Sequence, residues 1–97
     1  MKRMLIRSNT FITAAQKVVK KDARTAEVIK STLDLLSEDI YHVRLKTHKL
    51  KGNLKGSLAC SAGYDLRIVF KIVQHKDLEV ILLETIGIHD GGILARS

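Results

Sequence analysis

Two histidines, one aspartate and one arginine in the second half of the sequence have side chains that could transfer protons or stabilise charge at a phosphate. Asp65 and Arg67 lie two residues apart, His48 lies in a basic segment, and His89 follows the last apolar run. Histidine, with an unperturbed pKa of about 6.5, can act as acid or base near neutral pH, and a nearby carboxylate can hold it in the useful tautomer. Acid and base catalysis at a phosphodiester is the chemistry that these residue types allow.

The same residues also have ordinary structural interpretations. An Asp-x-Arg pair in a strand is usually a surface ion pair worth at most about 1 kcal/mol. A lone histidine is more often solvated or structural than catalytic, and His42 and His75 fall in a connector and a hairpin turn. No histidine spacing resembles a zinc site with cysteine partners, so the sequence predicts no metal site.

Residues 46–56, "KTHKLKGNLKG", form what we call the basic segment. It contains four lysines, one histidine and two glycines, and it has no carboxylate. Residues 1–56 carry 13 Lys and Arg against 5 Asp and Glu, whereas residues 57–97 carry 4 against 5. A polyanion is the simplest partner for positive charge concentrated in one half of the chain, because each neutralised phosphate releases counterions. The same positive charge would also attract an acidic protein.

Length and composition indicate one globular domain spanning residues 1–97. The single cysteine, Cys60, cannot form an internal disulfide, and this favours a reducing cytoplasm. Its flanks contain nothing that would lower its pKa, so we interpret it as a small buried residue. The longest apolar run is interrupted by Glu84 and is too short to cross a membrane.

The first half of the chain predicts a short strand followed by two helices. Residues 2–7 form the strand, and Ser8 caps a helix over residues 9–20. Asp22 is expected to cap a second helix, whose apolar stripe is formed by Ala26, Ile29, Leu33 and Leu36. The two helices should form a hairpin.

The second half predicts three antiparallel strands, because all six glycines follow residue 51. Residues 57–62, 64–72 and 78–87 form a meander. Alternation along 64–72 places Tyr64 on the apolar face, with Asp65 and Arg67 about 7 Å apart on the other. Asp65 should lie opposite residues 84–85, so His89 would overshoot it by four residues unless Gly87 bends the strand.

This order, β-α-α-β-β-β, defines an α+β fold with a helical hairpin on one face of a twisted antiparallel sheet. The other face is expected to stay open. It would then carry the functional surface together with its neighbouring loops.

Three segments, "THKLKGNLKG", "CSAGYDLRIVFKI" and "LLETIGIHD", give the chain a resemblance to a known family. In order and spacing, residues 46–90 resemble the RelE/YafQ family of type II toxins, which are messenger-RNA endoribonucleases neutralised by an antitoxin. The resemblance implies the fold described above. It also implies a cytoplasmic protein with three partners: an antitoxin, with which it would form a hetero-oligomer, messenger RNA and the ribosome.

The resemblance also implies roles for individual residues. His48, Asp65 and His89 match residues that act in cleavage in YafQ-like members, and Arg67 matches an arginine that contacts the scissile phosphate in RelE-like members. His48 and His89 would transfer protons, Asp65 would orient a histidine or act as base, and Arg67 would stabilise the transition state. The cleavage uses the RNA's own 2′-hydroxyl and implies no cofactor and no metal. The residues expected to hold RNA phosphates are Arg44, Lys46, Lys49, Lys51, Lys55 and Lys71.

The sequence also departs from the family. Residues 58–61 read Leu, Ala, Cys, Ser where relatives carry polar or basic catalytic groups, and the tail lacks an aromatic residue just after His89. Two alternatives therefore stay open beside the nuclease. One is an inhibitor of DNA gyrase like the related ParE toxins, and the other is a basic RNA-binding domain with weak or no catalysis.

Overall fold

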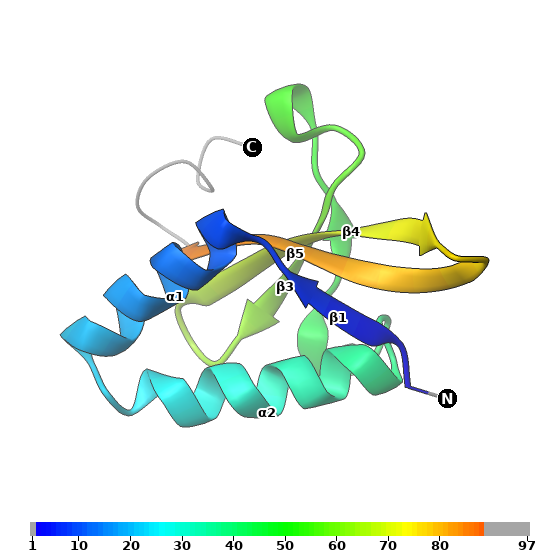
Figure 1. Ribbon diagram of the computed structural model, residues 1–97. Coiled ribbons are helices and arrows are strands. Elements are labelled where there is room, and N and C mark those ends of the chain that lie inside the picture. The colour runs from blue at the N-terminus through cyan, green and yellow to red at the C-terminus, as the bar shows by residue number, and fades with distance from the viewer. Residues whose placement is uncertain (1, 89–97) are drawn as a thin grey trace.

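The computed structural model describes residues 2–88 as two helices packed on one face of a five-stranded sheet (Figure 1). In the sheet order β1-β5-β4-β3-β2, β1 runs parallel to β5 and every other neighbouring pair is antiparallel. The predicted α+β class and element order are confirmed, but the sheet is mixed, because the helical hairpin carries the chain from β1 over to the far strands. The elements are β1 (Met4–Arg7), α1 (Asn9–Lys21), α2 (Thr25–Glu38), the 3₁₀ turn η1 (Val43–Leu45), β2 (His48–Lys49), the 3₁₀ turn η2 (Gly52–Leu54), β3 (Leu58–Ala62), β4 (Leu66–His75) and β5 (Leu78–Ile88).

The first helix begins where the sequence predicts, but the second does not. The Ser8 hydroxyl accepts a hydrogen bond from the amide of Phe11 at 3.0 Å and so caps α1. Asp22 is the C-cap of α1 and not the N-cap of α2, which begins at Thr25. The Asp22 carboxylate instead accepts hydrogen bonds from the backbone and side chain of Arg24. These bonds lower the pKa of Asp22, with the Arg24 side-chain bond the largest contribution.

Alternation along β4 sorts the side chains as predicted. Leu66, Ile68 and Phe70 lie in the main core, whereas Arg67 lies on the other face. Of the predicted stripe of α2, Ile29, Leu33 and Leu36 join this core and Ala26 is exposed. Tyr64, predicted for the core face, is fully exposed at 101%. The prediction was wrong because residues 63–65 form the turn between β3 and β4, so the alternation of the strand does not extend back to Tyr64.

A β-bulge in β5 changes the register between β4 and β5. Phe70 pairs with Leu83 and Val69 pairs with Thr85, so Glu84 is the extra residue. The bulge lets Leu83 and Ile86, three residues apart, both reach the core. The predicted register, with Asp65 opposite residues 84–85, is therefore wrong, and the strand continues through Gly87 to Ile88.

The face of the sheet away from the helices is only partly open. Leu50 and Leu54 of the basic segment cover Ala59 and Val69, and Leu50, Ala59 and Val69 are buried. Figure 1 shows this segment, with η2, rising on the side of the sheet opposite the helices. The expectation of an open face is corrected: its middle is a small second core, and half-buried or exposed polar residues surround it.

Candidate nucleic-acid interface

His48 and Arg67 lie on the same face of the sheet. His48 pairs with Ala59 and Ala59 pairs with Val69, and directly opposed residues of antiparallel strands share a face. Arg67 is two residues along β4 from Val69 and shares its face. Two strand spacings and two residue steps place the Cα atoms of His48 and Arg67 about 12 Å apart. Two long side chains at that separation can approach one phosphodiester from opposite sides.

The ring of His48 is held by its own chain. Its Nδ1 lies 3.1 Å from the carbonyl oxygen of Lys46, and His48 is exposed. A carbonyl oxygen can only accept, so this bond requires a proton on Nδ1 and leaves the lone pair of Nε2 facing solvent in the neutral ring. Lys46 adopts a left-handed backbone conformation, with φ of 50°, which turns the chain at this position. The geometry thus provides an accessible base at Nε2.

Arg67 lies in a row of small residues across three strands. It pairs with Ser61 on β3 and with Gly87 on β5, and all three lie at the end of the sheet nearest the β3–β4 turn. Gly87 has no side chain, Ser61 has a short one, and Arg67 itself is partly exposed. Gly87 is the residue where the sequence allowed a bend that could correct the overshoot of His89, but the register shift of β5 is at Glu84.

Asp65 does not occupy the strand position that alternation predicted. It lies in the turn that precedes β4, is exposed, and lines a cavity of about 610 Å³ beside the C-terminal end of α1. Lys17 and Lys21 of α1 line the same cavity, as do Gly87 and Ile88 of β5. The structure therefore places Asp65 at the end of the sheet beside the helices, and not beside Arg67 on the outer face.

His89 lies outside the described residues. The ladder of β4 and β5 ends at the pair Leu66–Ile88. In the sequence, Leu66 directly follows Asp65 and Ile88 directly precedes His89. The expected overshoot of four residues disappears because the register differs from the predicted one.

The predicted phosphate-binding cations fall into three groups. Lys46, Lys51 and Lys55 are exposed on the basic segment, and Arg44 is exposed on η1. Lys49 follows His48 in β2 and so projects toward the opposite face of the sheet. Lys71 is half-buried, and its Nζ lies 3.8 Å from Glu84 Oε2.

Sequence reasoning missed the polar pair of Ser57 and Glu84. The Ser57 hydroxyl donates to Glu84 Oε1 at 2.6 Å, and Ser57 is only 3% exposed. The one signal in the sequence was a single carboxylate inside the apolar run "VILLETIGI", which was interpreted only as a barrier to membrane insertion. The bulge that brings Glu84 into contact is a feature of pairing, and no local pattern encodes it.

Cys60 is structural, as predicted. It is fully buried, and desolvation raises the pKa of its thiol to about 12, so it carries no thiolate near neutral pH. Within residues 2–88, no three His, Cys, Asp or Glu side chains gather in a way that could hold a metal ion. No helix in this part of the chain combines the length and apolar composition needed to cross a membrane.

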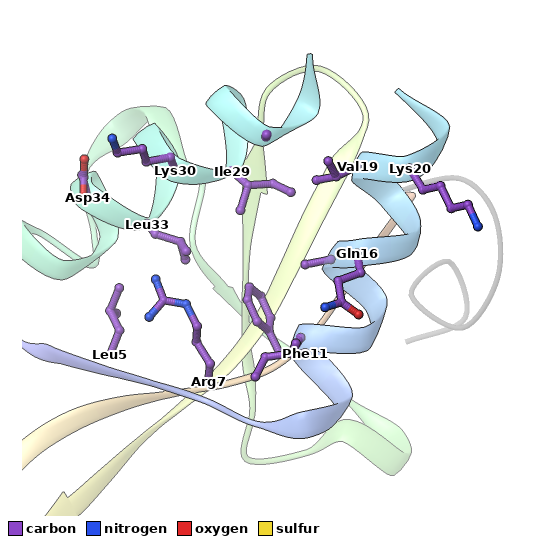
Figure 2. Close-up of a pocket in the computed structure, with 13 residues that line it drawn as sticks. Leu5, Arg7, Phe11, Gln16, Val19, Lys20, Ile29, Lys30, Leu33 and Asp34 are labelled. Carbon is purple, nitrogen blue, oxygen red and sulfur yellow. The ribbon is translucent and has the colours of Figure 1, made fainter. Parts of the chain in front are cut away.

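A largely apolar groove of about 700 Å³ lies between α1, α2 and β1 (Figure 2). Leu5, Phe11, Ile29 and Leu33 form much of its lining. Figure 2 shows Arg7 extending from β1 into this groove, with Asp34 on the facing helix. Among residues 2–88, no side-chain hydrogen bond or ion pair satisfies the Arg7 guanidinium. The groove therefore presents apolar surface around a cation without an anionic partner.

Comparison with solved structures identifies the class of fold. No protein-family model and no curated protein matches the sequence. The architecture, however, is that of the RelE/YafQ type of toxin, and the resemblance inferred from the sequence is confirmed at the level of the fold.

Three structures illustrate the likeness. The YoeB/ParE toxin from Agrobacterium tumefaciens superposes with a TM-score of 0.72 at 16% identity, covering 89% of this chain and 98% of that one. The E. coli DinJ-YafQ toxin-antitoxin complex gives 0.69 at 20% identity, covering 92% and 94%. The toxin-antitoxin complex RelBE2 from Mycobacterium tuberculosis gives 0.67 at 15% identity, covering 91% and 99%.

Proposed function

We propose that this protein is the toxin of a type II toxin-antitoxin pair and that it acts in the cytoplasm as an endoribonuclease on messenger RNA at the ribosome. The observation that carries the proposal is the placement of His48 and Arg67 on one face of a RelE/YafQ-type fold, beside a basic segment without carboxylates. A polyanion that crosses this face would meet a base, an arginine and exposed lysines together.

Cleavage would proceed by transesterification. Nε2 of His48 takes the proton of the 2′-hydroxyl, whose oxygen attacks the adjacent phosphorus. The bond to the 5′ oxygen breaks, and His89 donates a proton to that leaving oxygen. Arg67 stabilises the charge on the non-bridging oxygens. The products are a 2′,3′-cyclic phosphate and a free 5′-hydroxyl.

Asp65 is assigned to orienting His89. The support is the sheet register, since the pair Leu66–Ile88 joins the residue after Asp65 to the residue before His89. A carboxylate that accepts a hydrogen bond from an imidazole stabilises its protonated form and fixes its tautomer. This assignment differs from a base role for Asp65, because the turn places it away from the outer face that carries His48.

Expression without a partner, followed by RNA analysis, tests the function. The chain should arrest growth and leave transcripts cut at ends that carry a cyclic phosphate. Arg67→Ala should lower cleavage about 10²–10³-fold, as removal of one transition-state donor does, and His48→Ala about 10²–10⁴-fold. Arg24→Ala and His75→Ala, which change exposed residues elsewhere, are matched controls. Full toxicity of the Arg67 and His48 variants would refute the site, and arrest with intact transcripts but inhibited gyrase would favour the alternative.

The groove between α1 and α2 is the site that we propose for the antitoxin. Three cations line it, Arg7, Lys20 and Lys30, against the single carboxylate of Asp34. An amphipathic helix with a carboxylate opposite Arg7 would bury its apolar face and pair that cation. The RelBE2 and DinJ-YafQ structures are complexes of toxins with antitoxins.

Substitution of groove residues separates binding from toxicity. Arg7→Glu and Ile12→Glu, which change a cation and an exposed apolar residue of the groove, should abolish neutralisation by the antitoxin. The Arg7 variant should retain cleavage because Arg7 is remote from the outer face. Lys2→Glu, an exposed charge reversal outside the groove, is the control. Unchanged affinity of the antitoxin for the Arg7 variant, measured by calorimetry, would exclude the groove.

A further inference from the structure

Glu84, the extra residue of the β-bulge, connects three parts of the molecule. Its backbone carbonyl accepts a hydrogen bond from the hydroxyl of Ser8, the residue that caps α1, at 3.1 Å. Its side chain lies on the outer face, where Oε1 accepts from Ser57 and Oε2 lies near Lys71. A carboxylate with a side-chain exposure of 29% is thus held on the face where cations otherwise dominate.

Ser57 is the residue at which the basic segment returns to the sheet. Its carbonyl accepts from the amide of Leu50, and its own amide donates to the carbonyl of Leu54, both at 3.0 Å. Both backbone groups of Ser57 are therefore hydrogen-bonded to the basic segment. Its side chain has one partner, the Glu84 carboxylate at 2.6 Å, a distance typical of a charge-assisted hydrogen bond.

We propose that Glu84 is a positioning residue for RNA binding. Through Ser57 it fixes residues 50–56, the part of the basic segment that follows β2, in the orientation in which Lys51 and Lys55 meet the phosphates. The choice of RNA as the ligand rests on the proposed function, whereas the anchoring of the segment does not. His48 and Arg67 lie on strands that are held by their own pairing, so their positions do not depend on the Ser57–Glu84 hydrogen bond. That hydrogen bond therefore affects the binding of RNA and not the cleavage of its phosphodiester.

The variant that tests the proposal is Ser57→Ala. It removes the hydrogen bond and leaves every charge in place, whereas Glu84→Gln also removes a negative charge that repels phosphate. Ser57→Thr restores a hydroxyl at the same position and should restore the behaviour of the wild type. Ser31→Ala is the matched control, since Ser31 is exposed on α2 and its hydroxyl donates only to a carbonyl of its own helix.

Hydrogen exchange measures the anchoring directly. In Ser57→Ala, exchange should be at least about tenfold faster at the amide of Leu50, which donates to the Ser57 carbonyl, and at the amide of Lys55, which donates to the Gly52 carbonyl. The amides of β4 should exchange at an unchanged rate. The double variant Ser57→Ala/Glu84→Gln should exchange no faster than Ser57→Ala alone, because one bond is lost in both. Unchanged exchange in Ser57→Ala would overturn the proposal.

Cleavage kinetics measure the consequence for RNA. Ser57→Ala should raise KM about three- to tenfold and leave kcat within twofold. A merely destabilised protein would lose active molecules, lowering the apparent kcat with KM unchanged. An unchanged KM despite faster exchange would refute the positioning role. If the wild type cleaves no RNA, the proposed function fails, and the Kd of each protein for a short RNA is measured by filter binding. A Kd about three- to tenfold higher for Ser57→Ala than for the wild type then supports the positioning role, and an equal Kd refutes it.

Discussion

Substitution of Gly63 by alanine should destabilise the fold far more than the same substitution at Gly52. Both glycines have φ of +67°, which is unfavourable for any residue with a Cβ. They differ in their surroundings. A Cβ at Gly63 would lie 2.8 Å from Cγ1 of Val28, whereas nothing lies within 4 Å of a Cβ at Gly52.

The expected magnitudes follow from these two terms. The positive φ costs an alanine about 1–2 kcal/mol at either position. The contact at Gly63 adds about 1–3 kcal/mol, typical of overpacking, because Val28 is β-branched and has one preferred rotamer on its helix. Gly63→Ala should therefore lower the free energy of unfolding by about 2–5 kcal/mol, against about 1–2 kcal/mol for Gly52→Ala.

Urea unfolding and calorimetry measure the difference. For a chain of this size each kilocalorie per mole shifts Tm by roughly 4–8 °C. The double variant Gly63→Ala/Val28→Ala should regain much of the free energy of unfolding that the contact with Val28 costs, and the two substitutions should show a favourable coupling in a double-mutant cycle. Equal losses of Tm for Gly63→Ala and Gly52→Ala would refute the close approach of the β3–β4 turn to α2.

Three further predictions concern pH, salt and the β4–β5 turn. Burial raises the pKa of Cys60 from its ordinary 9.0 to about 12, so the thiol ionises at lower pH in the unfolded chain than in the folded one. The free energy of unfolding should therefore fall above pH 9 by about 1.4 kcal/mol per pH unit. Urea titrations of Cys60→Ala should lack this slope. Each lysine that contacts a phosphate adds about −0.7 to the slope of log K against log salt for single strands, so Lys51→Ala/Lys55→Ala should flatten the slope for RNA by about 1.4. Lys20→Ala, a control in the helix groove, should leave the slope unchanged. Asp77 has φ of 67° in the two-residue turn, so Asp77→Gly should raise the unfolding free energy by up to about 1 kcal/mol, whereas Asp77→Ala should lower it.

The helices and most strands could be predicted because their signals are local. Ser8 followed by apolar residues at helical spacing predicted α1, and the alternation through Leu66, Ile68 and Phe70 predicted the buried face of β4. Asp22 was misassigned because an aspartate between two helical patterns is a common N-cap, and no local pattern shows that α2 begins three residues later, at Thr25. Here its carboxylate binds Arg24 and the backbone just after α1.

The register of β5 could not be predicted from the residues around it. Residues 80–83 are all apolar, so the sequence contains no alternation that would reveal which of them face the core. The spacing of three between the buried Leu83 and Ile86 is explained only by the bulge at Glu84. Residue types suggested His48 and Arg67 as site candidates, but their common face depends on strand pairing between distant segments.

The second core explains how a segment with so many like charges can lie against the sheet. Two lysine charges about 7 Å apart repel by roughly 0.6–2.4 kcal/mol, depending on the effective dielectric constant. Leu50, between Lys49 and Lys51 in the sequence, is 6% exposed against Ala59 and Val69, and burial of one leucine contributes about 1.5–3 kcal/mol. These terms are of similar size, so the apolar contact alone leaves little margin. The pairing of β2 with β3 and the backbone bonds of Ser57 add to the attachment, and so does the Ser57–Glu84 hydrogen bond. The carboxylate of that bond lies on the sheet and not within the segment, which leaves the lysines exposed for an anionic partner.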